Sequence, residues 1–197
     1  MKNKLFTFLG TGNYGEVVYF FESADRERIS YKSKFIQEAL LHVFEEVEEV
    51  VIFLTKNARE GHWKNELKSI FEKSGITFKS IHIPDCKNET EIWEVFKCMY
   101  AEIEVGDHIS IDITHSFRTI PLIFNSVLNY AKTMKSIEVE RIVYAAYEAR
   151  ISDEAPILDV TALNLLTEWS FGVEQLLKTG NCTELIRNMK RSEEHTS

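Results

Sequence analysis

The residues best suited to chemistry lie in the segment "DITHSFRTIP", which spans residues 112–121. It places an acid, hydroxyls, an imidazole and a guanidinium between a run of apolar residues and a helix-like stretch whose first turn suits Pro121. The N–H groups of a turn, the positive end of a helix and the planar guanidinium of Arg118 together suit phosphate oxygens. The segment therefore predicts a site for a phosphate-bearing ligand.

Three residues of this segment have more than one interpretation. Asp112 is expected to be a structural acid that orders the loop by accepting N–H bonds, and a role as general base is the alternative. His115 is interpreted as a functional residue that stacks on a base or donates to a phosphate, although a lone loop histidine is often a surface residue. Phe117 is expected to pack the loop onto the domain, with stacking on an adenine as the alternative.

A second candidate loop is "GTGNYG", residues 10–15, which follows the first apolar run. Its glycines allow close backbone approach to a ligand, and Thr11 and Asn13 offer side-chain donors. The spacing matches the dinucleotide fingerprint only if a helix follows, whereas the next residues, "EVVYFF", are typical of a strand. A hairpin turn without a ligand is the alternative interpretation.

Strand-like and helix-like patterns alternate along the first three quarters of the chain, which predicts an α/β fold. We expect a Rossmann-like, mostly parallel sheet flanked by helices and followed by a short helical appendage. The expected strands span residues 4–10, 17–21, 49–55, 77–85, 107–114, 141–147 and 156–160. The expected helices span residues 32–47, 63–75, 90–103, 119–135, 163–181 and 183–191. The first two strands are expected to form a hairpin, and the helix 119–135, apolar on more than one face, could pack on a partner subunit.

The strand pattern stops near residue 161, which divides the chain into three expected parts. Residues 1–161 form the α/β domain, and residues 162–191 form a helical linker or the start of a truncated further domain. Residues 192–197 are expected to be a non-native tail, because "RSEEHTS" matches the in-frame translation of a common sequencing adapter. A genuine polar tail is the alternative.

Composition limits the possible partners and cofactors. A formal net charge of −8 argues against a sequence-independent grip on long nucleic acid, which needs many Lys and Arg contacts. Three widely spaced cysteines and scattered histidines, His42, His62, His82 and His108, indicate neither a disulfide framework nor a metal site, so we expect no metal and no cofactor. No apolar run approaches a membrane span, and a reducing cytoplasm is the expected location.

The segments "FLGTGNY", "VVYFF" and above all "DITHSFRTIP" resemble the CRISPR-associated Rossmann-fold (CARF) proteins. The resemblance implies a homodimer that binds a cyclic oligoadenylate second messenger across its two-fold axis. By position, one wall of the ligand site would comprise Gly10, Thr11, Gly12, Asn13 and Tyr14. The other wall would comprise Thr114, His115, Ser116, Phe117, Arg118 and Thr119. Ser116 stands where this branch often has glycine.

The expected function is therefore a sensor of cyclic oligoadenylate, with cyclic tetraadenylate favoured, in type III CRISPR antiviral defence. The alternative is a metal-independent ring nuclease, in which Arg118 stabilises the developing charge and Thr11, Asn13 or His115 positions the ribose hydroxyl. The HEPN ribonuclease domain of full-length relatives carries an R-x(4-6)-H motif, and the residues after 161 contain none. A third interpretation is a small nucleotide-utilising Rossmann enzyme that prefers ATP or NAD.

Overall fold

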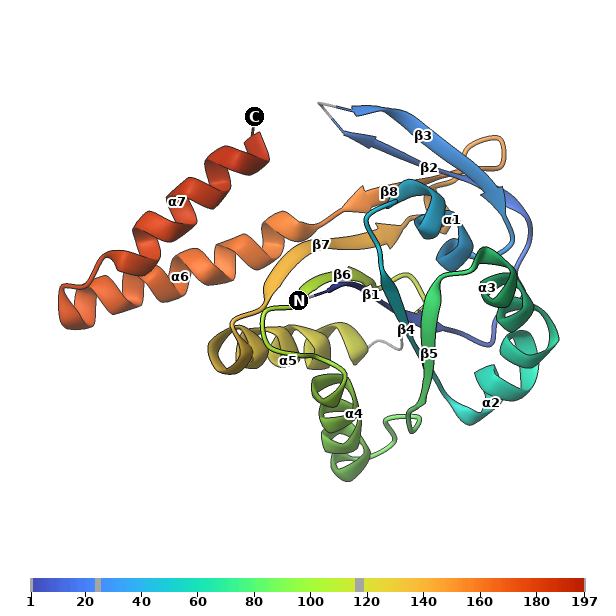
Figure 1. Cartoon of the computed structure of the whole chain (residues 1–197), viewed down its shortest axis with the longest axis horizontal. Helices are drawn as coiled ribbons and strands as arrows, with labels where there is room; N and C mark the ends of the chain where they lie inside the picture. Colours follow the sequence, from blue (N-terminus) through green and yellow to red (C-terminus); the bar gives the residue numbers. More distant parts are fainter. Residues whose placement is uncertain (1, 24–25, 116–118, 197) are drawn as a thin grey trace.

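The computed structural model describes residues 2–23, 26–115 and 119–196, and it confirms the predicted α/β fold (Figure 1). One sheet holds all eight named strands in the order β3-β2-β8-β7-β6-β1-β4-β5. The strands are β1 Asn3–Leu9, β2 Val17–Ser23, β3 Arg26–Ser33, β4 Glu49–Leu54, β5 Thr77–His82, β6 His108–Asp112, β7 Glu138–Ala145 and β8 Glu154–Asp159. The helices are α1 Ile36–Val43, α2 Lys56–Ala58, η1 Arg59–Leu67, α3 Lys68–Ser74, α4 Glu89–Ala101, α5 Ile120–Lys135, η2 Tyr147–Ala149, α6 Thr161–Thr179 and α7 Thr183–Thr196.

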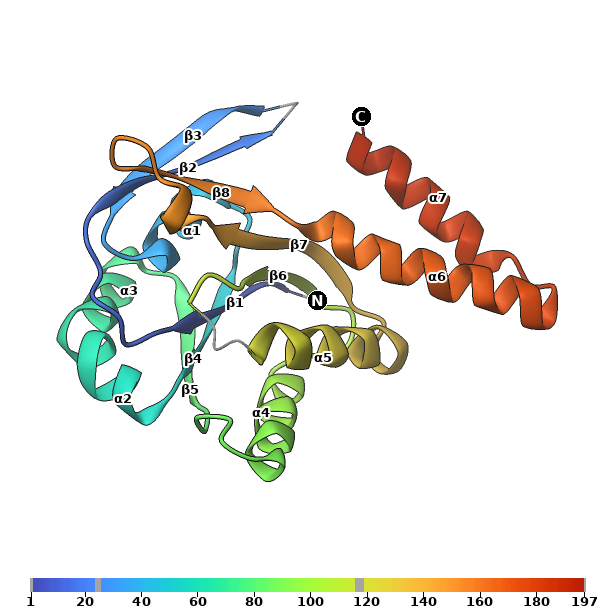
Figure 2. The same cartoon turned by 180° about the vertical axis from the view of Figure 1, so that it is seen from behind.

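The central strands are apolar on both faces because helices cover both faces of the sheet. Along β1, Leu5 and Leu9 pack into one hydrophobic cluster, while Phe6 and Phe8 pack into the other. This alternation follows from the two-residue period of a strand, and burial on both sides explains the nearly continuous apolar run in the sequence. The first cluster lies under α1, η1 and α3, and the second lies under α4 and α5 (Figures 1 and 2).

Strand β1 lies between β4 and β6 and runs parallel to both. The chain builds β4 and β5 on one side of β1 and later returns to place β6 and β7 on the other side. The strand order therefore reverses between β1 and β6, which is the point where open α/β sheets form their ligand crevice. The loops that leave β1 and β6 both start at this point.

The predicted hairpin between the first two strands is wrong. Both edges of β1 are occupied by β4 and β6, and β2 instead pairs with β3 and β8. Residues 10–16 are therefore a long connection that crosses the ends of β6, β7 and β8 before the chain enters β2. The prediction that a strand, and not a helix, follows the glycine loop is confirmed.

Other predicted boundaries change where local pairing overrides the helical pattern. The helix expected over residues 32–47 is shorter, because residues 26–33 form the edge strand β3. The helix expected over residues 63–75 is the second of two helices that meet at Gly61, whose backbone is not helical, and it begins directly after this residue. The first of the two comprises α2 and the start of η1 and was not predicted. The expected end of the second helix is confirmed, since Gly75 adopts a left-handed conformation with φ 74°. The last helix continues past residue 191 to residue 196.

Helices α6 and α7 pack on each other and extend away from the sheet (Figures 1 and 2). Their attachment includes an ion pair between Lys132 of α5 and Glu168 of α6. Gly172 of α6 is buried because the side chain and backbone of Leu185 lie against it. Several large apolar side chains of the two helices are exposed, namely Leu163, Leu166, Phe171, Val173, Leu177, Ile186 and Met189.

Candidate ligand site at the sheet edge

The two loops predicted to form the site meet at the carboxyl ends of β1 and β6. A Cβ atom placed on Gly10 would lie 3.6 Å from the Cβ and carbonyl oxygen of His115, and 3.0 Å from the Tyr14 hydroxyl. The contact with His115 would be an ordinary one, whereas the contact with the Tyr14 hydroxyl is tight, so a side chain at position 10 would displace the Tyr14 side chain within its own loop. The structure thus brings Gly10, Tyr14 and His115 into direct contact.

The Tyr14 ring lies at the centre of a small aromatic group. Its centroid lies 4.7 Å from the imidazole of His115 and 4.7 Å from that of His62, with edge-to-face geometry in both cases. Phe35, at the start of α1, closes the group at 5.4 Å from Tyr14. Such ring pairs stabilise a fixed orientation beyond simple area burial, so Tyr14 has little freedom to rotate.

Two polar atoms of this group are buried without a hydrogen bond of normal geometry within the described residues. They are the Tyr14 hydroxyl, which lies beside the Gly10 backbone, and Nε2 of His115. Burial raises the pKa of Tyr14 to about 12, with the charge of Asp112 adding to the effect. Burial also lowers the pKa of His115, the Asp112 carboxylate opposes that shift, and His62 adds to it. Both groups are therefore neutral near pH 7, and unpaired buried polar atoms of this kind can receive a ligand.

Asp112 and Thr114 fix the base of the second loop. The Asp112 carboxylate is fully buried and accepts one bond from the Thr7 hydroxyl at 2.6 Å and one from the Thr114 N–H at 2.9 Å. The Thr114 hydroxyl in turn accepts a bond from the Ala145 N–H of β7 at 2.9 Å. Asp112 thus has the contacts predicted for a structural acid, and the Thr114 side chain is engaged with the neighbouring strand.

A cavity of about 180 Å³ lies beside the loops. Gly10, Thr11 and His115 line it from the two predicted loops. Its other walls come from Phe8, Leu9, Phe53, Thr55 and Ile83. Thr55 follows β4 and Ile83 follows β5, so the cavity is formed by the carboxyl ends of four adjacent parallel strands.

The remaining predicted site residues either are absent from the lining of this cavity or lie outside the described part of the chain. Gly12 and Asn13 are exposed on the crossing connection, and Thr119 is exposed at the start of α5. Ser116, Phe117 and Arg118 lie outside the described residues, so their expected roles stay predictions.

Sequence reasoning missed His62, which it named only among the scattered histidines that indicate no metal site. In the structure, Nε2 of His62 lies 2.8 Å from the carbonyl oxygen of Gly12, and its ring contacts Tyr14. The order of the elements could have indicated His62. The helical segment that contains it follows β4, and β4 runs parallel to β1, so the start of this segment lies at the same sheet edge as the loop after β1.

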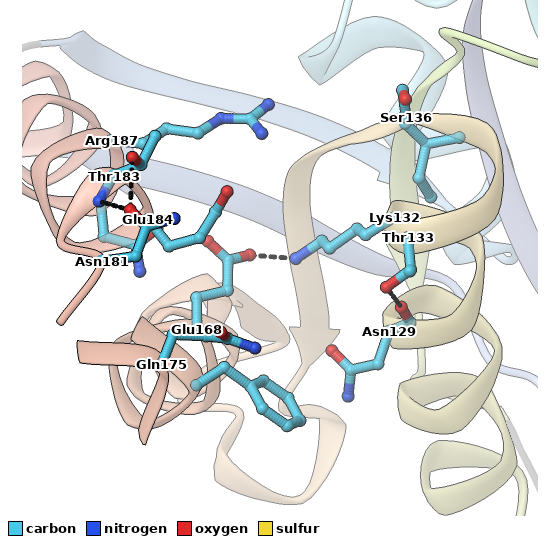
Figure 3. A pocket seen from close by; sticks show the side chains of 13 residues that line it. Asn129, Lys132, Thr133, Ser136, Glu168, Gln175, Asn181, Thr183, Glu184 and Arg187 are labelled. Carbon is cyan, nitrogen blue, oxygen red and sulfur yellow. Dashed lines mark hydrogen bonds and ion pairs between the residues drawn. The ribbon is translucent and has the colours of Figure 1, made fainter. Parts of the chain in front are cut away.

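A larger cavity of about 710 Å³ lies away from the loops, between α5 and the pair α6 and α7 (Figure 3). Figure 3 shows the Lys132 ammonium directed at the Glu168 carboxylate across this space. Polar side chains of both signs, including Glu184 and Arg187, line the remainder. Because the charges of this cavity partly compensate one another, it offers weaker recognition of an anion than the loop edge does.

One group in the described residues has side chains that could hold a metal ion. His108, Glu138 and Glu140 place their ligand atoms within 4.8 Å of one another at the amino ends of β6 and β7. The group is partly exposed, and Nδ1 of His108 lies 2.5 Å from Glu140. It lies at the edge of the sheet opposite the loops and has the geometry of a surface ion-pair cluster. No helix in the described ranges is long and apolar enough to cross a membrane.

Known proteins resemble this chain over the region that carries both loops. A family model described as "CRISPR system endoribonuclease Csx1, CARF domain" matches residues 4–150. CRISPR-associated protein MJ1674 of Methanocaldococcus jannaschii is 32% identical over 111 residues, which cover 54% of this chain and 17% of that protein. Among solved structures, phosphofructokinase-2 from Escherichia coli in complex with fructose-6-phosphate matches 72% of this chain and 54% of its own chain. The TM-score is 0.39 and the sequence identity is 10%, so this similarity carries no functional argument. Because the family model spans most of the chain, including the loops after β1 and β6, this chain belongs to the CARF-domain family of the CRISPR endoribonuclease Csx1.

Proposed function

We propose that this domain is a sensor that binds a cyclic oligoadenylate, with cyclic tetraadenylate favoured, at the edge formed by the loops after β1 and β6. The observation that carries the proposal is the contact between the two loops at the point where the strand order reverses. The buried and unpaired Tyr14 hydroxyl and His115 Nε2 lie in the same place. A nucleotide there can meet exposed backbone N–H groups from one loop and the guanidinium of Arg118 from the other.

The sensor acts as a homodimer in which two copies of this edge face one ring. Support comes from exposed apolar side chains near the two ends of α5, where Leu122 is 73% exposed and Met134 57% exposed. Leu163 and Leu166 of α6 are exposed to a similar degree. Apolar residues in such numbers on adjacent helices are typical of an interaction surface. Under this proposal the domain comprises residues 1–161, with residues 162–191 as the helical connection to an effector domain and residues 192–197 as a non-native tail.

The decisive experiment is a titration of the purified protein with cyclic tri-, tetra- and hexaadenylate, with ATP and NAD as competitors. We expect saturable binding of cyclic tetraadenylate and loss of binding in Arg118→Ala. Arg28→Ala is the matched control, because this exposed arginine lies on β3, at the far edge of the sheet, where it pairs with Glu154 and lies over the ring of Phe20. Preference for ATP or NAD, or unchanged affinity in Arg118→Ala, would contradict the proposal.

A dimer is tested by light scattering at several protein concentrations. Leu122→Asp is expected to shift the protein to a monomer, because a buried unpaired charge at an interface is costly. Val105→Asp is the control, since Val105 is equally exposed, at 72%, but lies in the loop before β6 at the opposite sheet edge. A protein that stays monomeric at all concentrations with cyclic tetraadenylate present would contradict the dimer.

The alternative function is a metal-independent ring nuclease. In that reaction a ribose 2′-hydroxyl attacks the adjacent phosphorus, the P–O5′ bond breaks, and the products are a 2′,3′-cyclic phosphate and a free 5′-hydroxyl. One observation favours this alternative: Nε2 of His115 is buried and unpaired within the described residues, and burial favours the neutral imidazole. A neutral imidazole can accept the proton of the 2′-hydroxyl. Incubation with radiolabelled ring in EDTA separates the two functions. Linear product that disappears in His115→Ala supports the nuclease, and an intact ring supports the sensor alone.

A further inference from the structure

His62 connects the crossing connection of residues 10–16 to the helix that follows β4. Its Nε2 atom lies 2.8 Å from the Gly12 carbonyl oxygen, and its Nδ1 atom lies 3.7 Å from the Glu66 carboxylate. Glu66 is itself paired with Lys34, which precedes α1. A chain of polar contacts thus runs from Lys34 through Glu66 and His62 to the backbone of Gly12. The change of helix direction at Gly61 places His62 beside this backbone.

The ring of His62 is held in one orientation by its aromatic neighbours. It contacts Tyr14 at 4.7 Å and Phe35 at 6.0 Å, with edge-to-face geometry in each case. The Gly12 carbonyl can only accept a hydrogen bond, so Nε2 of His62 must carry the proton and donate it. Nδ1 is then left facing the Glu66 carboxylate. The two ring nitrogens therefore have separate partners, with the donor directed at Gly12.

The bond to the Gly12 carbonyl also fixes the direction of the next N–H group. In a trans peptide the C=O of one residue and the N–H of the following residue point in opposite directions. With the Gly12 carbonyl directed at His62, the Asn13 N–H is directed away from η1. Within residues 2–23, 26–115 and 119–196, this N–H has no hydrogen-bond partner, and Asn13 is exposed. It is an oriented donor that an anion can use.

We propose that His62 is a positioning residue: it holds the Gly12–Asn13 peptide so that the Asn13 N–H faces a phosphate of the bound ligand. Its effect on ligand affinity rests on the proposed function, whereas its effect on the connection itself does not. The imidazole acts through the backbone and through Tyr14, whose ring also contacts His115. His62 thus links the glycine loop to the loop after β6 without being part of either loop.

Three variants test this role. His62→Ala removes the donor, His62→Gln retains an N–H donor at a similar reach, and His42→Ala is a matched control on α1, where the imidazole stacks on Tyr31 away from the loops. Backbone order parameters (S²) of residues 10–16 are measured by NMR relaxation in the ligand-free protein, together with urea unfolding. Loss of the bond to the Gly12 carbonyl predicts a fall in S² across this segment in His62→Ala, toward the value of about 0.6 that marks a flexible backbone. The S² values in His62→Gln and His42→Ala should stay near those of the unchanged protein.

The same proteins are then titrated with cyclic tetraadenylate. We expect about fivefold weaker binding in His62→Ala, recovery in His62→Gln and no change in His42→Ala, while the urea unfolding curves verify that each variant is folded. Unchanged S² of residues 10–16 in His62→Ala overturns the proposal, as does equal loss of affinity in His62→Ala and His62→Gln. If the unchanged protein binds no cyclic oligoadenylate while His62→Ala still lowers S² in this segment, the proposed function fails and the positioning of the connection stands.

Discussion

Removal of the Asp112 carboxylate should destabilise the fold and loosen the loop after β6 together. The side chain is fully buried and accepts bonds from the Thr7 hydroxyl and the Thr114 N–H. A hydrogen bond to a charged group contributes about 1.5–3 kcal/mol, so Asp112→Ala should lower the free energy of unfolding by about 3–5 kcal/mol. Asp112→Asn should cost only about 1–2 kcal/mol, because its amide oxygen can face the Thr114 N–H while its NH₂ donates to the Thr7 hydroxyl.

Urea unfolding monitored by circular dichroism measures these differences. Asp85→Ala is the control, because Asp85 forms a surface ion pair with Lys87 and should cost less than about 1 kcal/mol. A double-mutant cycle of Thr7→Val with Asp112→Ala should give a coupling energy of about 1–2 kcal/mol, since each single variant breaks the same bond. Additive effects in the cycle, or a stable Asp112→Ala, would refute the view that this carboxylate anchors the loop. A stable Asp112→Asn that binds the ring but cannot cleave it would indicate a general base.

The other predictions concern the loops and the helical appendage. Gly10→Ala should weaken cyclic tetraadenylate binding about tenfold in a titration and cost about 1–2 kcal/mol in urea unfolding, because its Cβ would lie 3.0 Å from the Tyr14 hydroxyl. Burial lowers the pKa of His115, so its contribution to stability is full above its unfolded pKa of about 6.5 and is lost as pH falls through the folded value. Unfolding midpoints should therefore fall between pH 7.5 and 5 by more in the unchanged protein than in His115→Gln. Gly172→Val should detach α7 by overpacking against Leu185, at a cost of about 1–3 kcal/mol, seen as faster amide exchange in residues 183–189.

The strands with apolar residues on both faces could be predicted from the sequence, and β1, β4 and β6 lie close to their expected positions. The edge strand β3 could not, because "RERISYKS" carries only two large apolar residues, Ile29 and Tyr31, and its charges suit an edge that must avoid further pairing. The hairpin was predicted from closeness in sequence, which strands usually follow. Here the two parallel neighbours of β1 leave no edge for β2.

For the site, sequence patterns indicated which loops meet but not which helix supports them. Gly10 and His115 could be selected because the carboxyl ends of parallel strands share one edge, whereas Tyr14 was selected only through the resemblance to CARF proteins. His62 lies in a stretch with no periodicity toward that edge, and its contact with Gly12 depends on the change of direction at Gly61. A break of this kind within a helix leaves no distinct signature beyond a single glycine.

The path of residues 10–16 also limits how this edge can vary. From Leu9 to Val17 the chain passes three intervening strands, a distance of roughly 19 Å at about 4.8 Å per strand spacing. The same stretch reaches at most about 28 Å when fully extended. Loss of two residues would leave about 21 Å, which still spans the strands, whereas loss of three would leave about 18 Å, which does not. The connection therefore has a minimum length set by the order of the strands, so this edge can gain residues that bulge outward far more readily than it can lose them.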